Sequence, residues 1–388
     1  MIVKLGDICT FQSGGTPSKG TEEFFNGTIP WITTTALNGG KIDETQAVDW
    51  ITEKAIEKSA AKLVPAFSIM VGTRVGVGKV AVNAVQMSTS QDIISLLNID
   101  ENRWSKDYLC KYIQGKNTFL NYQARGATIK GIKIDVLANL ELEEIPLEEQ
   151  VRISETIDKV KEILDARKRE LLELDKLIKA RFAELFGDTK SNDKGWNTLP
   201  LFKILEKGSS VSYGIVQTGD NVEDGVPVFR PIDIAGGHLP HINELKRTKK
   251  EISDKYKRTL LNGYELLITV RGSVGETFQV NDEYKGCNVG RNIVPLRFNT
   301  DIVLYKYMEQ YFAQSGTKDI LVTMTKGIAL QGLNMSEFRE IAVIVPPIDL
   351  QKKFVEFANI IDKSKAVVQK SLDETQVLFD SLMQKYFG

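Results

Sequence analysis

The sequence predicts an α+β protein in which a mixed α/β module occurs twice and each copy is followed by a long helix. The first observation is a repeat: GATIKGIKIDVLANLELEEIPLEEQ (126–150) returns as GIALQGLNMSEFREIAVIVPPIDLQ (327–351), an offset of 201 residues. The second is that long segments without proline or glycine (147–186 and 348–387) follow the two copies. A period this long exceeds the roughly 20–50 residues of stacked repeat arrays, so it indicates a duplicated domain.

The module ahead of each long segment reads as short strands and loops with one helix. Weaker matches extend the repeat upstream at an offset of 197 residues, among them Pro30 with Pro227 and Arg74 with Arg271. Helical periodicity predicts a matching pair of helices at 102–114 and 301–314. Apolar runs between glycine-rich breaks predict strands at 29–35, 68–73, 91–99, 226–234, 265–270 and 291–298.

The segments 147–186 and 348–387 predict two helices of roughly 60 Å each, at ~1.5 Å per residue. Prolines ahead of them and glycines behind them (Gly187, Gly388) suit helix boundaries. Both segments carry a heptad stripe in one register, which polar residues interrupt in places. The stripe residues expected to join the helices are Ile153, Ile157, Val160, Leu164, Leu171, Leu174, Ile178, Phe354, Ile361, Val368, Leu372, Phe379 and Leu382.

Each long helix needs a partner to bury its stripe, and the obvious partner is the other helix. A parallel or an antiparallel pair is topologically possible, and separate packing of each helix on a core is the alternative. The predicted domains are a first module (1–146), a central helix (147–187), a second module (188–346) and a C-terminal helix (347–388).

Composition indicates an ordinary globular protein and favours the cytoplasm. Of 388 residues, 42% are hydrophobic and 26% are charged, which is typical of soluble domains. Three scattered cysteines are too few for a disulfide framework, and neither a signal-peptide core nor a run of about 18–20 apolar residues is present. The net charge of −1 lacks the basic excess of a free-standing DNA-binding module. Positive charge for nucleic acid must therefore be local or come from a partner.

The sequence offers almost no catalytic or metal-binding motif. The two histidines, His238 and His241, lack companions at ligand spacing and favour a surface loop over a metal site. The stretch GTRVGVGKV (72–80) fails as a phosphate-binding loop, because Thr73 stands where the first glycine belongs and Val80 where a Ser or Thr must hold magnesium. No nucleophile elbow occurs. These absences argue against an enzyme.

Recognition chemistry gathers in loops that recur in both modules. GTRVGVGKV and TVRGSVGET each place an arginine among glycines after an apolar strand. Glycine lets a backbone approach a surface, and arginine forks onto phosphate or guanine. QARGATIKGI and TMTKGIALQGL add groups that commonly position phosphates. Tight turns with incidental basic residues are the alternative, which the recurrence disfavours. The candidate phosphate-positioning residues are Arg74, Lys79, Arg125, Thr128, Lys130, Arg271, Arg291, Lys326 and Gln331.

The chain resembles the specificity subunits of type I restriction-modification systems over essentially its whole length. The resemblance rests on LGDICTFQSGGTPSKGTEEFFNGTIPWITTTALNGGKI, on VGTRVGVGKV…STSQDI, on SYGIVQTGDNVEDGVPVFRPIDI, and on IPLEEQ and VPPIDLQ, each leading a long helix that ends in Phe-Gly. It implies two target recognition domains, each reading half of a bipartite, asymmetric DNA site. It also implies that the long helices separate them as an intramolecular antiparallel coiled coil.

The same resemblance implies a non-catalytic subunit without a cofactor or metal of its own. Its expected partners are double-stranded DNA, DNA adenine methyltransferase subunits that use S-adenosylmethionine, and a restriction/translocase subunit that uses ATP and magnesium; no membrane is involved. Methyltransferase subunits that carry part of the phosphate contact would explain why the chain lacks a basic excess.

The modules differ upstream of their shared loops, where SGGTPSKGTEEFF in the first faces SSVSYGIVQTGDN in the second. Repetition suits phosphate contacts and divergence suits base contacts, so we expect different half-sites. The candidate base-reading residues are Ser13, Thr16, Ser18, Thr33, Thr34, Thr35, Ser209, Ser212, Tyr213, Gln217 and Arg230.

Two other interpretations stay open at this point. An adapter whose modules bind proteins would show no salt-sensitive retention on DNA, even beside a methyltransferase. A single-chain enzyme is the other interpretation, but a fused methyltransferase needs a cofactor-binding segment for which two repeats leave no room in 388 residues.

Overall fold

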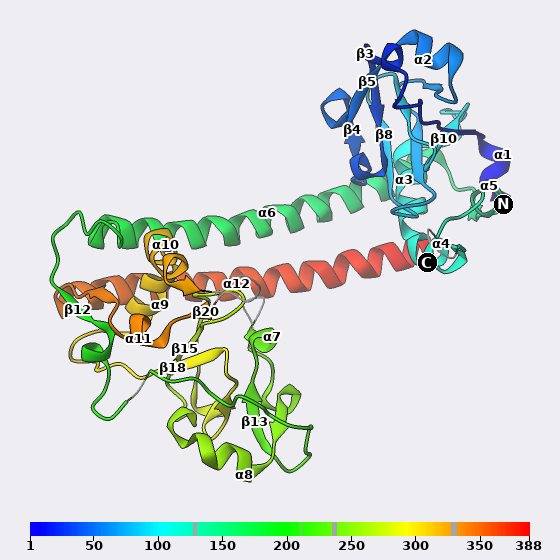
Figure 1. Ribbon diagram of the computed structural model, residues 1–388. Helices are drawn as coiled ribbons and strands as arrows, with labels where there is room; N and C mark the ends of the chain where they lie inside the picture. Colours follow the sequence, from blue (N-terminus) through cyan, green and yellow to red (C-terminus); the bar gives the residue numbers. More distant parts are fainter. Residues whose placement is uncertain (127–129, 210, 235–238, 327–331) are drawn as a thin grey trace. The chain divides into compact units, whose positions relative to one another are not determined.

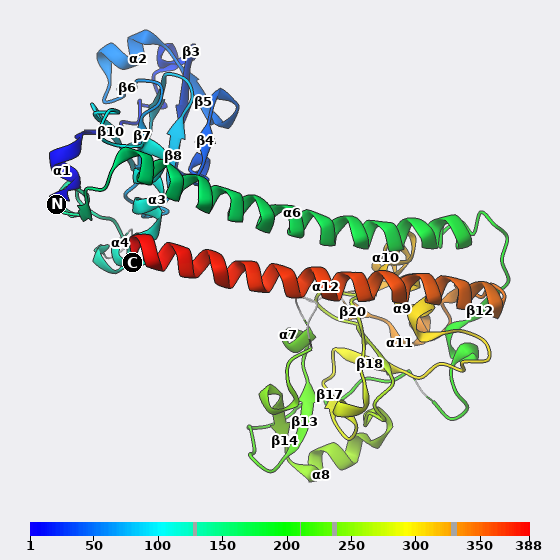
Figure 2. The ribbon, with the colours of Figure 1, turned by 180° about the vertical axis from the view of Figure 1, so that it is seen from behind.

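The computed structural model describes residues 1–126, 130–209, 211–234, 239–326 and 332–388. Its contacts divide the chain into two compact units, one formed by Met1–Lys168 with Lys370–Gly388 and the other by Arg169–Gln369. The long helices begin and end at the predicted module boundaries, but the units divide inside them. Each unit therefore contains one module and a part of both long helices (Figures 1 and 2).

The first unit is built on two main sheets. Its strands are β1 (Ile2–Lys4), β2 (Thr10–Ser13), β3 (Phe25–Ile32), β4 (Lys41–Ile42), β5 (Asp49–Ile51), β6 (Leu63–Val64), β7 (Ile69–Gly72), β8 (Val80–Asn83), β9 (Met87–Thr89), β10 (Ile93–Leu97) and β11 (Glu141–Glu143). Its short helices are α1 (Leu5–Ile8), α2 (Glu53–Lys58), α3 (Lys106–Gly115), α4 (Asn117–Gln123) and α5 (Ile134–Ala138). The sheets run β2-β10-β7-β8-β4 and β5-β3-β9-β6, and β1 pairs with β11. Strands β7 and β8 are buried at every residue, so they form the centre of the module.

The second unit repeats this plan with shorter sheets. Its strands are β12 (Thr198–Pro200), β13 (Val226–Phe229), β14 (Lys246–Thr248), β15 (Leu266–Thr269), β16 (Thr277–Gln279), β17 (Asn288–Val289), β18 (Ile293–Leu296), β19 (Thr325–Lys326), β20 (Gly332–Leu333) and β21 (Ala342–Ile344). Its short helices are α7 (Pro231–Ile234), α8 (Lys250–Ser253), α9 (Tyr305–Ala313), α10 (Ser315–Thr323) and α11 (Met335–Arg339). The sheets run β14-β13-β17 and β16-β15-β18, and β12 pairs with β21 as β1 pairs with β11.

The predicted long helices are confirmed as α6 (Leu147–Phe186) and α12 (Ile348–Phe387). The carbonyl of Pro146 accepts the Glu149 amide at 2.9 Å, so the proline lies at the helix start, where its missing N–H costs nothing. Gly187 ends α6 with a φ of 78°, in the left-handed region that glycine tolerates. No helix among the described residues is long and apolar enough to cross a membrane.

The heptad stripe joins the two helices inside each unit. In the first unit, the start of α6 shares a buried cluster with Phe387 at the end of α12; in the second, the end of α6 packs on the start of α12. The helices therefore pair in opposite directions, as the family resemblance implies. The stripe residues Ile153, Ile157, Val160, Leu164, Ile178, Phe354, Ile361 and Val368 are buried, and Leu171, Leu174, Leu372, Phe379 and Leu382 are half-buried. Lys365, which interrupts the stripe, pairs with Asp175 of α6.

The end of each long helix packs on one module, α12 on the first and α6 on the second. Phe387 packs on Tyr108 of α3, with ring centroids 5.3 Å apart. Phe186 packs in the same manner on Tyr307 of α9, at 4.9 Å. The aromatic residue ahead of the final glycine therefore anchors α6 to the second module and α12 to the first.

A buried glutamine fixes the start of each long helix to its own module. Gln150 accepts a hydrogen bond from the Ser105 amide at 2.9 Å, and its side-chain N–H group donates to the carbonyls of Arg103 and Ile145, both at 2.9 Å. Gln351 makes the same three bonds with Leu304, Ile302 and Pro346 at 2.9–3.0 Å. This shared amide explains the final letter of the repeated IPLEEQ and VPPIDLQ.

Replacing Gln150 by leucine should lower the free energy of unfolding of the first unit by roughly 3 kcal/mol, because three partly buried backbone groups lose their partners. Gln351→Leu should act alike on the second unit. Denaturant titration measures both changes. Lys159→Ala, at an exposed position of α6, is the matched control and should stay within about 0.5 kcal/mol. Glutamine variants no worse than this control would contradict a fixing role.

Candidate nucleic-acid interface

In the first module, several loops come together at one edge of the sheets. Strand β3 lies parallel to β9, with Ile32 opposite Thr89, so both strands end there. Strand β7 ends at the same place, because Gly72 pairs with the first residue of β10, Ile93. The loops at 13–18, 33–35, 73–79 and 90–92 are therefore neighbours, although the sequence separates them widely.

The loop that holds Ser13, Thr16 and Ser18 is anchored by two glycines. The amide of Gly14 donates to the Ile93 carbonyl at 3.0 Å and that of Gly15 to the Thr89 carbonyl at 2.9 Å. A Cβ on Gly15 would lie 1.9 Å from the Ala60 carbonyl oxygen, so only glycine fits. All three predicted hydroxyl side chains are exposed. Their position at the edge agrees with a role in reading bases.

The threonines that follow β3 differ from one another. Thr33 and Thr35 share a hydrogen bond between their hydroxyl oxygens at 2.8 Å, and Thr35 is exposed. Thr34 is only 5% exposed, and its methyl group lies close to Gly72. A side chain covered in this way does not suit the base contact predicted for Thr34.

Beside this edge, Arg125 and residues 131–133 form a basic cradle with Arg74. The backbones of Arg125 and Gly131 exchange hydrogen bonds of 2.9 and 3.0 Å, and the Ile132 amide donates to the Thr73 carbonyl at 2.8 Å. The result is a hollow of about 470 Å³ lined by Arg74, Gln123, Arg125, Gly131, Ile132, Lys133, Asp135 and Val136.

The cradle holds three cationic side chains and one carboxylate. Arg74 is 56% exposed, and one of its terminal nitrogens lies 3.9 Å from Asp92. Lys133 lines the same hollow as Arg74 and Arg125. The sequence analysis did not select Lys133, although it is the second lysine of KGIK and could have been found there. Lys79 and Lys130 are exposed nearby. Thr128 lies outside the described residues. Phosphate binding is the chemistry that this arrangement suits.

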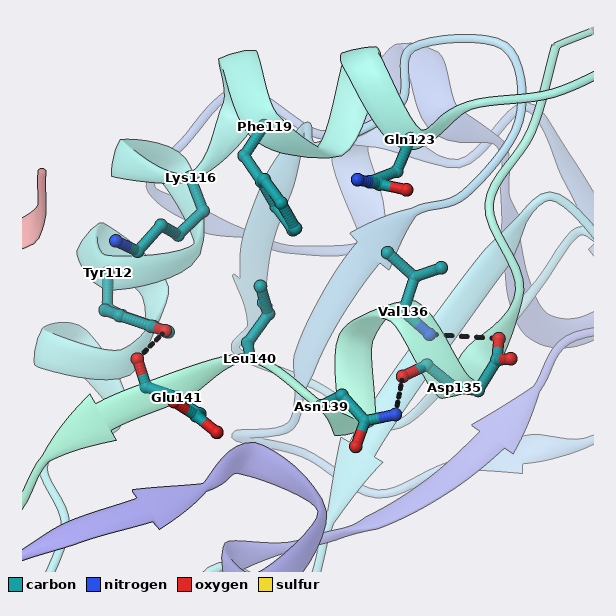
Figure 3. Close-up of a pocket in the computed structure, with 9 residues that line it drawn as sticks. All are labelled: Tyr112, Lys116, Phe119, Gln123, Asp135, Val136, Asn139, Leu140 and Glu141. Atoms are coloured by element: carbon teal, nitrogen blue, oxygen red, sulfur yellow. Dashed lines mark hydrogen bonds between the residues drawn. The ribbon is translucent and has the colours of Figure 1, made fainter.

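A more apolar hollow of about 470 Å³ adjoins the cradle and shares Gln123, Asp135 and Val136 with it. Figure 3 shows the Phe119 ring of α4 pointing into it, above Leu140 and Val136. The Tyr112 hydroxyl on its far side donates to the Glu141 carbonyl at 2.7 Å. The cradle is thus bordered by a surface that mixes aromatic and polar groups.

The second module forms its edge with the same backbone bonds. The Gly290 amide donates to Phe229 as that of Ser90 donates to Ile32, at 2.8 and 2.9 Å. The Ile215 amide donates to the Val289 carbonyl at 2.7 Å, in the place where Gly15 donates to Thr89. The two edges are therefore equivalent at these positions.

At the second edge, Arg271 is the counterpart of Arg74. Its guanidinium lies 5.9 Å from the Tyr213 ring centre, a cation–π distance. A Cβ on Gly332 would come within 2.7 Å of the Arg271 side chain, so the glycine leaves room for it, as Gly131 does for Arg74. The arginine–glycine contact is the feature that both modules repeat most closely.

The other candidates of the second module divide into three groups. Gln217, Tyr213 and Arg291 are exposed, whereas Ser209 and Ser212 are half-buried. For Lys326 only the backbone is described, in the short hairpin of β19 and β20, and Gln331 and His238 lie outside the described residues. The exposed candidates can therefore contact DNA more readily than the half-buried ones.

Arg230 is already paired. Its guanidinium donates to both carboxylate oxygens of Asp233 at 2.7 and 3.0 Å, and this bonding raises the pKa of the arginine. Two of its five N–H donors are thereby committed to a carboxylate. The pair holds the Arg230 side chain against α7, so a base contact would have to use the remaining donors in this fixed orientation.

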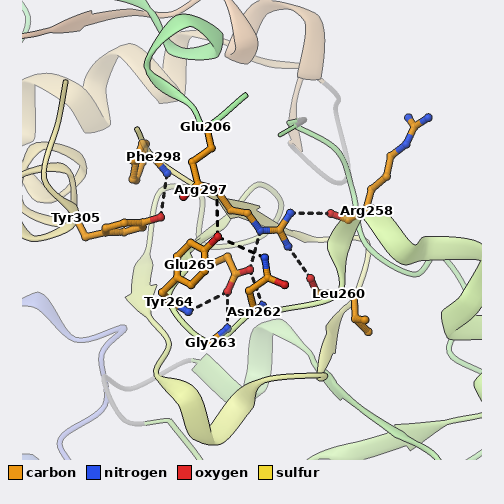
Figure 4. A network of polar contacts seen from close by, with 10 residues as sticks. All are labelled: Glu206, Arg258, Leu260, Asn262, Gly263, Tyr264, Glu265, Arg297, Phe298 and Tyr305. Carbon is orange, nitrogen blue, oxygen red and sulfur yellow. Dashed lines mark hydrogen bonds and ion pairs between the residues drawn. The ribbon is translucent and has the colours of Figure 1, made fainter. Parts of the chain in front are cut away.

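The strand that leads to Arg271 starts at a buried ion pair, shown in Figure 4. Glu265 is fully buried, bonds Arg297 at 2.8 Å, and accepts the amides of Asn262, Gly263 and Tyr264 at 2.7–3.2 Å. Arg297 also donates to the carbonyls of Arg258 and Leu260. The pair therefore fixes the turn from which β15 runs to the edge.

The described residues can be compared with the needs of a metal site and of a thiol nucleophile. No group of three or more His, Cys, Asp or Glu there could hold a metal ion. Burial raises the pKa of the Cys9 and Cys110 thiols to about 12 and that of Cys287 to about 11. Thiols that stay protonated at neutral pH are poor nucleophiles.

Glu265→Leu should destabilise the second unit by about 3 kcal/mol, because it leaves the largely covered Arg297 without its counter-charge. Adding Arg297→Met should recover a large part of the loss, since an apolar pair avoids the cost of burying charge. Denaturant titration of the two variants checks both steps. Lys318→Ala, which breaks an exposed ion pair with Glu276 in the same module, should cost less than 1 kcal/mol. An equally small effect of Glu265→Leu would contradict the role given to the pair.

The chain matches the sequence model of the family described as "Type I restriction modification DNA specificity domain" twice, over residues 1–175 and 201–374. It is 24% identical over 322 residues to the "Type I restriction enzyme EcoBI specificity subunit" of Escherichia coli, covering 75% of this chain and 67% of that protein. It is 25% identical over 412 residues to the "Type I restriction enzyme MjaIX specificity subunit" of Methanocaldococcus jannaschii, covering 99% and 91%.

Two solved structures share the fold. The type I restriction-modification S subunit from M. genitalium superposes with a TM-score of 0.55 at 18% identity, covering 100% of this chain and 96% of that one. A chain from a structure described as "Structural basis underlying complex assembly and conformational transition of the type I R-M system" gives 0.61 at 17% identity, covering 100% and 97%.

Proposed function

The chain belongs to the type I restriction-modification DNA specificity family, because two matches to one family model cover most of the chain, and we propose that it reads a bipartite DNA site for a methyltransferase. It is a specificity subunit, which is the non-catalytic component of such a system. Each module would read one half-site in a cytoplasmic complex.

The observation that carries this proposal is the pair of equivalent edges. In both modules an arginine side chain packs against a glycine, Arg74 against Gly131 and Arg271 against Gly332. Equivalent hydrogen bonds hold the backbones around them. The exposed side chains around these arginines differ between the modules. Repeated cations suit phosphate, which is the same at every step, whereas divergent tips suit the different base pairs of an asymmetric site.

The paired helices supply the connection between the two readers. Buried stripe residues and aromatic ends tie both helices into both units, so in this proposal they hold the half-sites at a constant separation. Methyltransferase subunits that use S-adenosylmethionine, and in a full complex a translocase that uses ATP and magnesium, would supply the chemistry. They would also supply part of the phosphate contact, in addition to the local cations of a chain whose net charge is −1.

Neutralising the cradle of the first module should weaken binding to every DNA sequence. Arg125→Gln, Lys130→Gln or Lys133→Gln should each lower the salt dependence of the binding constant by about one per lost phosphate contact and leave the recognised sequence unchanged. Salt titrations on matched and unrelated duplexes measure this. Lys159→Gln on α6 is the control. A variant that changes the recognised sequence would refute the phosphate role of that residue.

Co-expression with a cognate methyltransferase subunit tests the function itself. The complex should methylate adenines in a split motif with a constant gap, and exchange of residues 1–146 for those of a relative should change one half only. Genomic methylation mapping reads both results. An active methyltransferase that forms no complex with this chain would favour an adapter that binds proteins.

A further inference from the structure

A three-residue turn crosses the centre of each edge at equivalent positions. In the first module, residues 90–92 link β9 to β10, and the Asp92 carbonyl accepts the Thr73 amide at 2.8 Å. In the second, residues 290–292 link β17 to β18, and the Asn292 carbonyl accepts the Val270 amide at 2.8 Å. Bonds of 3.0–3.1 Å close both turns, from Ile93 to Ser90 and from Ile293 to Gly290. The two backbones are thus held in one conformation.

The middle residue of each turn projects from this fixed backbone. Gln91 and Arg291 are both exposed, while the residue after each is half-buried and the strand that follows is buried. Neither side chain makes a hydrogen bond or ion pair to any residue that the structure describes. Both therefore keep their donors and acceptors free of every described residue.

The neighbouring pair of divergent positions, Thr33 and Arg230, lacks this freedom. Thr33 and Arg230 are equivalent, since each follows the strand residue that accepts the turn's first amide. Thr33 is bonded to Thr35, and Arg230 is bonded to Asp233. Of the two pairs, only Gln91 and Arg291 combine a rigid backbone, exposure and an unused side chain.

The residue types at this position match two different base pairs. In the major groove, glutamine bonds the N6 and N7 of adenine with two hydrogen bonds, and arginine bonds the O6 and N7 of guanine. Resting on the proposed function, we propose that Gln91 reads an adenine in one half-site and that Arg291 reads a guanine in the other. Arg291 is thereby moved from the phosphate-positioning group, and Gln91 enters as a residue that the sequence analysis did not select.

Exchanging the two residue types tests this assignment. The complex of the full chain with its methyltransferase subunits is used to select bound duplexes from a randomised DNA pool. Gln91→Arg should replace adenine by guanine at one position of one half-site, with a change in preference of roughly 5- to 150-fold. Arg291→Gln should make the reverse replacement in the opposite half-site. The gap between halves should stay constant.

Each result has one meaning. Gln91→Ala should relax the same position without creating a new preference, and Lys130→Gln should weaken binding with the motif unchanged. Unchanged motifs, changes in the same half for both exchanges, or equal loss of binding to all sequences would overturn the assignment. A wild-type complex that selects no split motif would instead refute the proposed function, so the two failures are distinguishable.

Discussion

The structure depends on two buried glutamine amides, Gln150 and Gln351. Each saturates three backbone groups where a sheet module meets the start of a long helix. Because a buried amide tolerates neither a shift nor a rotation without losing a bond, it sets the direction in which each helix leaves its module. Within each unit the end of the other long helix is held as well, because Phe387 packs on Tyr108 of α3 and Phe186 on Tyr307 of α9.

Local signals were enough to predict the long helices. Proline ahead, glycine behind and a heptad stripe between are encoded within each segment, so the bounds of α6 and α12 agree with the prediction. The packing of each helix end on a module was not predicted in detail. It depends on contacts between residues far apart in the chain, such as that of Phe387 with Tyr108. The same distance explains why the structural units divide inside the helices and not at their ends.

At the candidate site, the sequence indicated which loops carry basic side chains and glycines, but not which loops lie together. Arg74 and Arg271 were selected for the glycines beside them in the sequence, whereas the glycines that the structure places against their side chains, Gly131 and Gly332, come from a loop much further along the chain. The pair of Arg230 with Asp233 is local, three residues apart in the sequence, and was not selected as a signal. Burial of Thr34 could not be predicted, since it follows from which strands are neighbours. The prominence of Gln91 has the same origin, because only strand pairing brings its turn to the centre of the edge.

Duplication also explains how a chain without excess charge can recognise DNA. Two equivalent scaffolds keep their cations at fixed points, so the local field at each edge is set by a few side chains such as Arg74, Arg125 and Lys133, and the net charge matters little. The loop side chains around these cations are free to differ, because hydrogen bonds to the strand ends hold the loop backbones. A change of specificity then requires only substitutions of these loop side chains, while the strands and the paired helices stay the same.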